Sequence, residues 1–326
     1  MKKHLPYPPK SRRNKTIDIV AVGELLVDII GQTISENLGD VRTFERFQGG
    51  SPANFAANMA RLGNASALIA CVGNENLGKY LVQSVKKTGV ICDYIAVEPV
   101  APTTIVLVSR TTGTPDFIAY RTADRMILPS HIPNNVLQKT QFYHTTCFAL
   151  SQEPAQSSIV DGARRAAQLD CKLSIDVNYA PSIWGDRDEA RRVIAEYCSH
   201  GAFVKMSLDD IVRLFDDPAL DEQTAIATFH NWGAELICLT KGAAGSLVSW
   251  EFGQKIQHQY ARKISECADA TGAGDAFWSG FLTAWLDGYE PPECAVAGSN
   301  IAAMKLAVVG PLPEAVSREK IYEIFD

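Results

Sequence analysis

The chain contains 326 residues, 46% of them hydrophobic, with 23 glycines and 16 prolines. This is sufficient for the core of one large α/β domain, with or without a small appendage. The net charge of −6 and the isoelectric point near 5.6 give no electrostatic reason to expect nucleic acid as a partner, and no apolar run is long enough to predict a membrane-spanning helix.

Residues 1–15 are rich in lysine, arginine and proline and lack the apolar segment of a secretory signal. We therefore expect a flexible basic tail ahead of a domain at 16–326. The eight cysteines are scattered singly, without a C-x-x-C pair, and most lie in apolar strand-like runs. This usage is typical of reduced, buried thiols in a cytoplasmic protein.

Short apolar runs alternate with longer amphipathic stretches, which is typical of a parallel sheet flanked by helices. Strands are predicted at 17–23, 67–73, 142–146, 172–176, 202–206, 235–240 and 246–250. Helices are predicted at 52–62, 77–88, 154–169, 188–198, 224–232, 273–286 and 293–308.

Two regions depart from this alternation. The residue pattern at 95–97, 103–109 and 116–120 alternates like antiparallel strands, and residues 111–115 between the last two are predicted to form a hairpin turn. A further strand is indicated at 41–47. We therefore expect a small antiparallel lid, built from insertions at about 33–48 and 93–121.

Residues 267–281 carry the most specific chemical signal. Gly272, Ala273 and Gly274 have almost no side chain, so their N–H groups can converge on an anion, and a helical pattern follows directly. Asp275 would repel a resting phosphate there. We therefore interpret it as the base that takes a proton from a nucleophile aimed at that phosphate. The alternative is an ordinary acid in the first turn of a helix, behind a tight turn.

This segment resembles the C-terminal signature of the PfkB, or ribokinase-like, family of sugar kinases. Residues 269–277 match it, with Ala270 where many members have threonine, and residues 49–63 resemble the family's N-terminal glycine-glycine signature. The resemblance implies a ribokinase-like three-layer αβα domain with a mostly parallel central sheet and a small β lid. It also implies that Asp275 is the base and that the N–H groups of residues 272–274 stabilise the phosphoryl group during transfer.

On the side of the phosphate donor, the resemblance places Thr240, Gly242 and Gly245 beside the phosphates of ATP, and Asn300 on the helix along the adenine pocket. Read alone, the T-x-G-x-x-G sequence is equally well explained as a hairpin turn, and the helix as a packed small-residue helix. Residues 205–210 resemble the K-x-N-x-x-E pattern of the family, which assigns Lys205 to ATP and Asp210, acting through water, to Mg²⁺. The alternative, compatible reading of this segment is a capped helix N-terminus.

On the acceptor side, the resemblance assigns Asp28, Gly49, Gly50 and Asn54 to the floor of the sugar site. An acid in an apolar run such as that around Asp28 is seldom buried without a partner or a function.

The resemblance assigns three more residues to the acceptor: Arg121, Asp176 and Asn178. Asp176 and Asn178 could equally be turn residues. Ala180 replaces the arginine usual in the family, which favours a neutral sugar over an acceptor with a phosphate or carboxylate.

The sequence thus predicts an ATP-dependent sugar kinase with fructose as the leading acceptor. Ketodeoxygluconate, deoxygluconate-type acids, ribose and nucleosides remain alternatives, as does a sugar- or nucleotide-binding protein without catalysis. An NAD-linked dehydrogenase is disfavoured because no G-x-G-x-x-G follows a strand.

The expected cofactors are ATP and Mg²⁺. Whether a monovalent cation such as K⁺ near 269–271 is also needed, as in some relatives, stays open. The expected partners are small molecules, with neither nucleic acid nor membrane. A second copy could pair through the exposed edge of the lid.

Overall fold

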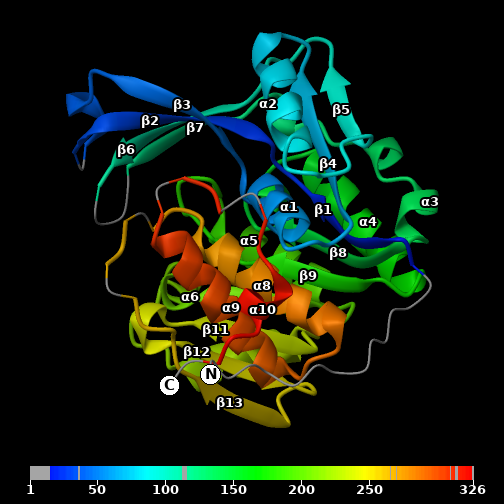
Figure 1. Ribbon diagram of the computed structural model, residues 1–326. Coiled ribbons are helices and arrows are strands. Elements are labelled where there is room, and N and C mark those ends of the chain that lie inside the picture. Colours follow the sequence, from blue (N-terminus) through cyan, green and yellow to red (C-terminus); the bar gives the residue numbers. More distant parts are fainter. Residues whose placement is uncertain are drawn as a thin grey trace.

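The computed structural model (Figure 1) describes residues 15–35, 37–111, 116–264, 266–268, 270–308, 310–312 and 315–324. The expected tail at 1–14 and the centre of the expected hairpin turn at 112–115 lie outside the described residues. Lys15, the last residue of the expected tail, is fixed by a hydrogen bond from Nζ to the carbonyl of Leu169 at 2.9 Å.

A nine-stranded sheet forms the centre of the molecule, in the order β13-β12-β11-β10-β9-β8-β1-β4-β5. Every neighbouring pair from β11 to β5 is parallel, and the pairings β11–β12 and β12–β13 are antiparallel, so that among these strands β12 alone runs in the opposite direction. The predicted mostly parallel sheet is therefore confirmed. Its strands are β1 (Ile17–Val22), β4 (Ser66–Gly73), β5 (Ile95–Glu98), β8 (Thr140–Thr146), β9 (Lys172–Asp176), β10 (Phe203–Ser207), β11 (Leu236–Thr240), β12 (Ser246–Trp250) and β13 (Lys255–Gln259).

Helices cover both faces of this sheet, and each layer has its own hydrophobic core, as expected for a three-layer αβα domain. One layer contains α1 (Ser51–Arg61), α2 (Asn76–Lys86), α8 (Ala273–Asp287), α9 (Pro291–Leu306) and α10 (Arg318–Ile321). The other contains α3 (Asn134–Leu137), α4 (Ala155–Gln168), α5 (Arg187–Cys198), α6 (Leu208–Phe215) and α7 (Glu222–Asn231).

A second, four-stranded sheet projects from the body at the upper left of Figure 1. Its order is β3-β2-β6-β7, and two of its three pairings are antiparallel, while β2 and β6 are parallel. We call it the small sheet. Its strands are β2 (Leu26–Ile34), β3 (Phe44–Gly49), β6 (Ile105–Arg110) and β7 (Phe117–Tyr120).

One strand expected in the lid belongs elsewhere. The run at 95–97 forms β5, which pairs in parallel with β4 at the edge of the central sheet. The alternating pattern could not reveal this, because β5 is partly exposed and so alternates like a lid strand although its partner is β4. The small sheet also takes in all of β2, which begins at Leu26, earlier than the expected insertion at 33.

Helices α8 and α9 pack with their backbones almost in contact. A Cβ added to Gly280 would lie 2.8 Å from the carbonyl oxygen of Ala297, and one added to Gly298 would lie 2.8 Å from the carbonyl oxygen of Phe277. No real Cβ approaches another atom so closely, so only glycine permits this spacing.

Among the helices of the described residues, none is long and apolar enough to cross a membrane. The described cysteines are free thiols. Most are buried as expected, while Cys92 is half-buried and Cys267 is exposed.

Candidate active site

The carboxyl ends of four neighbouring parallel strands bring polar residues together. Thr146 ends β8 and is in register with Asp176 at the end of β9, and Ser207 at the end of β10 is in register with Thr240 at the end of β11. In open α/β sheets, ligands bind outside this edge. The N-termini of α1, α6 and α8 supply the other residues of the candidate site.

The turn before α8 presents main-chain amides. Gly272 is the N-cap residue and has a φ of 74°, a left-handed conformation that glycine adopts without strain. Within the described part of the chain, the N–H groups of Gly272 and Gly274 have no hydrogen-bond partner, whereas that of Ala273 donates to the carbonyl of Ala270 at 3.2 Å. Fewer amides are therefore available to an anion than the sequence analysis expected. Two amides are open, because the middle one closes the turn.

Asp275 lies next to this turn and contacts α1. Its Oδ1 accepts a hydrogen bond from Oγ of Ser51 at 2.6 Å. Burial and the carboxylate of Asp176 raise the pKa of Asp275 to about 7, against hydrogen bonds from Ser51 and Asn54 and the charge of Lys205, which lower it. A carboxyl group with this pKa can accept a proton near neutral pH and then release it.

The residues expected to form the floor of the sugar site lie close together. Asp28 on β2 fits against Gly49 so tightly that a Cβ there would lie 2.1 Å from Oδ2 of Asp28. Burial raises the pKa of Asp28 to about 7. Asn54 on α1 accepts a hydrogen bond from Nε2 of Gln48 at 3.0 Å. Gly50, with a φ of 100°, lies against the backbone of Glu24.

Arg121 does not extend toward an acceptor, contrary to the expectation. Its side chain is 3% exposed and pairs through Nη2 with Asp124 at 2.6 Å. Nη1 donates to the carbonyl of Phe148 and to Oγ of Ser151, and the guanidinium lies over the Phe148 ring at 4.2 Å. These contacts occupy most of its donors, so Arg121 joins Asp124 to the Phe148–Ser151 segment.

Lys205 and Asp176 form a buried ion pair next to the turn at Gly272–Gly274, which we call the anion turn. The Lys205 ammonium lies 3.0 and 2.9 Å from the two carboxylate oxygens of Asp176. Burial opposes the charge on Lys205, but Asp176 and Asp210 outweigh it and raise its pKa. A Cβ at Gly274 would lie only 2.8 Å from this Nζ, which places a positive charge directly beside one of the open amides.

Asp210 completes the capping box of helix α6, in which Ser207 is the N-cap residue. Its Oδ2 accepts hydrogen bonds from the N–H and Oγ of Ser207 at 2.8 and 2.7 Å, and its Oδ1 accepts one from the N–H of Tyr179 at 3.1 Å. The capped-helix reading is thus correct, and a metal could be reached only through water. Among the described residues, no group of three or more His, Cys, Asp or Glu side chains could hold a metal ion.

The T-x-G-x-x-G sequence forms the hairpin turn between β11 and β12, at the same edge of the sheet. Oγ1 of Thr240 donates to the carbonyl of Met206 at 3.3 Å. Gly242 and Gly245 both have positive φ, and Gly242 has open space around its Cα. The segment is therefore a hairpin turn whose geometry is also compatible with a position beside the ATP phosphates.

Two predicted residues have other roles in the structure. The Asn300 side chain is fully buried, accepts a hydrogen bond from Arg262, and donates to the carbonyls of Ile321 and Glu323. It ties α9 to the C-terminal segment and has no donor left for adenine. Asn178 is exposed with a φ of 26°, and its N–H donates to Asp176, as a turn residue does.

Three site residues were missed by the sequence analysis. Ser51 is the hydrogen-bond donor to Asp275. Glu24 accepts a hydrogen bond from the N–H of Ser51 at 3.1 Å, and burial raises its pKa to about 8. Lys305, on α9, lies against Gly272. The available signal was a charged residue within an apolar run, which had been used for Asp28 but not for Glu24 or Lys305.

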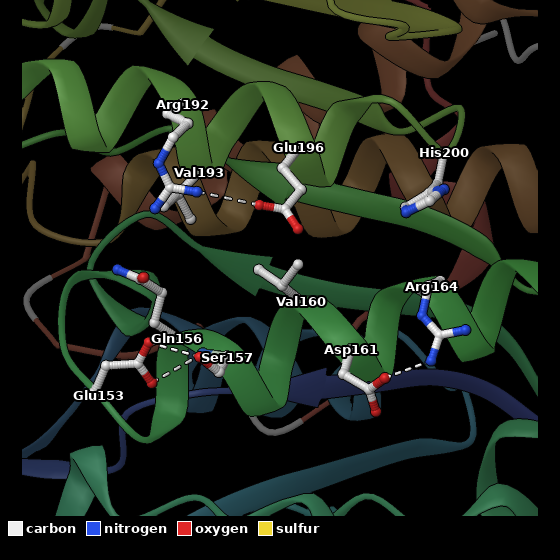
Figure 2. A pocket seen from close by; sticks show the side chains of 10 residues that line it. All are labelled: Glu153, Gln156, Ser157, Val160, Asp161, Arg164, Arg192, Val193, Glu196 and His200. Atoms are coloured by element: carbon white, nitrogen blue, oxygen red, sulfur yellow. Dashed lines mark hydrogen bonds and ion pairs between the residues drawn. The ribbon is translucent and has the colours of Figure 1, made fainter.

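Two hollows in the described part of the surface lie away from Asp275. A groove of about 440 Å³ runs between α4 and α5 (Figure 2), in the layer opposite α8. A smaller apolar cavity of about 320 Å³ lies along α9 and is lined by Arg262, Ile264, Ala303, Met304, Ala307, Lys320 and Glu323. Only the second adjoins the helix pair that carries the anion turn.

An αβα domain that presents open amides, a buried ammonium and a carboxylate with a pKa near 7 at the carboxyl edge of its sheet has the parts needed for phosphoryl transfer. Residues 16–315 match the model of the pfkB family carbohydrate kinases. The chain belongs to this family and is an ATP-dependent sugar kinase, as the sequence predicted.

Named relatives cover nearly the whole chain. The chain is 30% identical over 313 residues to an ATP-dependent 6-phosphofructokinase of Thermoanaerobacterium thermosaccharolyticum, covering 96% of this chain and 95% of that one. It is 29% identical over 318 residues to the probable fructokinase-6, chloroplastic, of Arabidopsis thaliana, covering 94% and 81%.

Solved structures share the fold. The fructokinase of Halothermothrix orenii is 32% identical, with a TM-score of 0.74 over 87% of this chain and 98% of that one. A double mutant of the Vibrio cholerae O395 fructokinase, in its fructose-, ADP- and potassium-bound form, is 23% identical, with a TM-score of 0.82 over 95% and 98% of the two chains.

Proposed function

We propose that this kinase is a fructokinase, transferring the γ-phosphoryl group of ATP to a hydroxyl of fructose. The observation that carries the proposal is the position of Asp275. This carboxyl group has a pKa of about 7, lies beside the open amides of Gly272 and Gly274, and contacts helix α1, which also carries Asn54 of the sugar floor.

In the proposed reaction, a fructose hydroxyl held near Asp28 and Asn54 attacks the γ-phosphorus. The new O–P bond forms as the bond between the γ-phosphorus and the bridging oxygen breaks, and ADP leaves with that electron pair. Asp275 accepts the hydroxyl proton. The amides of Gly272 and Gly274 and the nearby Lys205 ammonium stabilise negative charge on the phosphoryl oxygens.

The donor would extend from this turn along the sheet edge. Thr240, Gly242 and Gly245 lie at the end of β11, where a phosphate chain can approach open backbone. The apolar cavity along α9 suits the flat face of adenine better than the predicted Asn300 contact. Magnesium would be carried by the ATP phosphates and reached by Asp210 through water, where it would neutralise phosphate charge.

A neutral acceptor is favoured by the charges around the sugar floor. Asp28 and Glu24 are acidic, and two of the basic side chains described above, Arg121 and Lys205, are already paired with Asp124 and Asp176. Position 180 is alanine. A second candidate acceptor is fructose 6-phosphate, because one of the relatives reported above is a 6-phosphofructokinase.

The test is magnesium-dependent ADP release with a panel of acceptors: fructose, fructose 6-phosphate, ribose, 2-keto-3-deoxygluconate and a nucleoside. We expect the highest kcat/KM with fructose. A higher value with fructose 6-phosphate would replace the proposal by its second candidate. If none of the acceptors gave ADP release, the protein would be a binding protein without kinase activity toward these compounds.

Three further assignments are part of this proposal. The small sheet would act as a lid over the sugar and exclude water. Its edge strands β3 and β7, with exposed apolar side chains at Phe47, Ile118 and Tyr120, favour pairing with a second copy. Light scattering at several concentrations would test the dimer. The largely buried free cysteines favour a cytoplasmic location.

A further inference from the structure

A lysine is buried directly behind the anion turn. Lys305, near the C-terminal end of α9, is 5% exposed. Its side chain runs against Gly272, where a Cβ would lie 3.9 Å from Cε of Lys305. Its Nζ lies 3.4 Å from the carbonyl oxygen of Val308, just beyond the helix. An ammonium group is seldom buried unless its surroundings stabilise the charge.

The surroundings of Lys305 favour a cation. The last carbonyls of α9 have no partners within the helix, and the negative end of its dipole points the same way. The carbonyl of Leu306 accepts a hydrogen bond from the N–H of Ala268 at 2.8 Å, which fastens the strand-to-helix loop to this helix end. The ammonium thus lies at the C-terminal end of α9, near the carbonyl of Val308, on a side chain that contacts the turn at Gly272.

We propose that the Lys305 ammonium is a built-in cation for the anion turn, so that this kinase works without potassium. The proposal rests on the phosphoryl transfer proposed for the turn at 272–275. A fructokinase of the same fold is described in a potassium-bound form. A second monovalent cation does not fit beside Lys305, because two like charges at contact distance repel strongly in a buried site.

The fixed charge acts on the turn and on the nucleotide phosphates. It strengthens the electrostatic attraction of the Gly272 end of the turn for an anion, and it is always present, because it is covalently part of α9. Lys305 is therefore a positioning residue. It contacts the turn, and the turn contacts the phosphoryl group.

The first experiment uses the unmodified full-length protein. ADP binding is measured by calorimetry and turnover by ADP release, with potassium chloride exchanged for choline chloride at constant ionic strength. We expect both the dissociation constant and kcat to stay unchanged. Activation or tighter ADP binding on adding potassium would overturn the proposal. ADP binding is measured without sugar, so it remains informative even if no acceptor is phosphorylated.

The second experiment compares variants in choline chloride. Lys305→Met removes the charge but keeps the length of the side chain, and it is expected to weaken ADP binding and lower turnover by about 10²-fold. Lys305→Arg keeps the charge and is expected to retain more of both. Equal losses in the two variants would indicate a packing role and overturn the assignment. Lys139→Met, at an exposed lysine remote from the site, is the matched control. Thermal unfolding confirms that each variant is folded; if Lys305→Met is not, the potassium titration of the native protein decides.

Discussion

The groove between α4 and α5 and the cluster around Asp275 differ in how their charges are satisfied. In the groove, Asp161 pairs with Arg164 at 2.6 Å and Arg192 with Glu196 at 3.4 Å, and all four side chains are at least 39% exposed (Figure 2). Around Asp275, four carboxyl groups (Glu24, Asp28, Asp176 and Asp275 itself) have a raised pKa because burial disfavours their charged form, and two backbone amides have no partner among the described residues.

This difference distinguishes a surface groove from a candidate binding site. A surface groove whose ion pairs are exposed leaves little for a ligand to gain, because water already satisfies them. A buried carboxyl group without a full set of partners carries an energetic cost that a ligand can relieve.

The most direct way to break the comparison is to remove the base. Asp275→Asn keeps the size and the hydrogen bond to Ser51 but cannot accept a proton. We expect kcat to fall by about 10²–10⁴-fold while ATP binding is retained. Steady-state kinetics and calorimetry measure the two effects. Asp161→Asn, in the groove, is the matched control and should keep full kcat. Full turnover in Asp275→Asn would refute the assignment.

The buried ion pair should matter most for stability. Lys205→Met leaves Asp176 buried without its partner, so we expect the free energy of unfolding to fall by about 3–5 kcal/mol. Urea unfolding followed by circular dichroism measures it. The half-exposed pair Lys172–Glu235, with exposed fractions of 32% and 30%, provides the control. Lys172→Met should cost less than about 1 kcal/mol. Equal losses would show that burial does not distinguish the two pairs.

The pH dependence of kcat/KM tests the hydrogen bond between Ser51 and Asp275. Turnover needs ionised Asp275, so kcat/KM should decline as the pH falls below the pKa of about 7. The Ser51 hydrogen bond favours the ionised form. Ser51→Ala should therefore raise this pKa, move the acid limb to higher pH and lower kcat/KM by about tenfold at neutral pH. Ser157→Ala, at an exposed position of α4, should leave the pH profile of kcat/KM unchanged. An acid limb that stays in place in Ser51→Ala would show that Ser51 does not act on Asp275.

The smallest effect is expected in the groove itself. Arg192→Ala removes one exposed ion pair, so the free energy of unfolding should change by less than about 1 kcal/mol. The kcat/KM for fructose should not change. A marked loss of activity in this variant would mean that the groove takes part in function after all.

The sequence predicted the layers of the fold well because its strands are continuous apolar runs, which is what burial on both faces produces. It misplaced β5, whose exposed positions mimic a lid strand. It also assigned Asp28, Gly49, Gly50, Asn54 and Asp275 to one site. In the structure Asp28 packs against Gly49, and Asp275 is hydrogen-bonded to Ser51 and Asn54, although these partners lie more than two hundred residues away in the sequence.

What the sequence could not predict is which donors are already used. Arg121 and Asn300 have the right residue types, but their hydrogen bonds are taken by Asp124 and by the C-terminal segment. Lys305 is a single lysine in an apolar helix, and only the packing of α9 against the turn shows what it contacts. Partner choice of this kind depends on three-dimensional geometry, which residue spacing does not record.

The close glycine packing of α8 and α9 has a mechanical consequence. One helix starts with the turn at 272–275 and the other ends with the buried lysine and borders the apolar cavity, and almost no space separates them at Gly280 and Gly298. Because these two helices are packed so tightly, the segments of α8 and α9 proposed to contact the substrates cannot move independently of one another. Any methyl group wedged between the helices would misalign donor and base in a single movement.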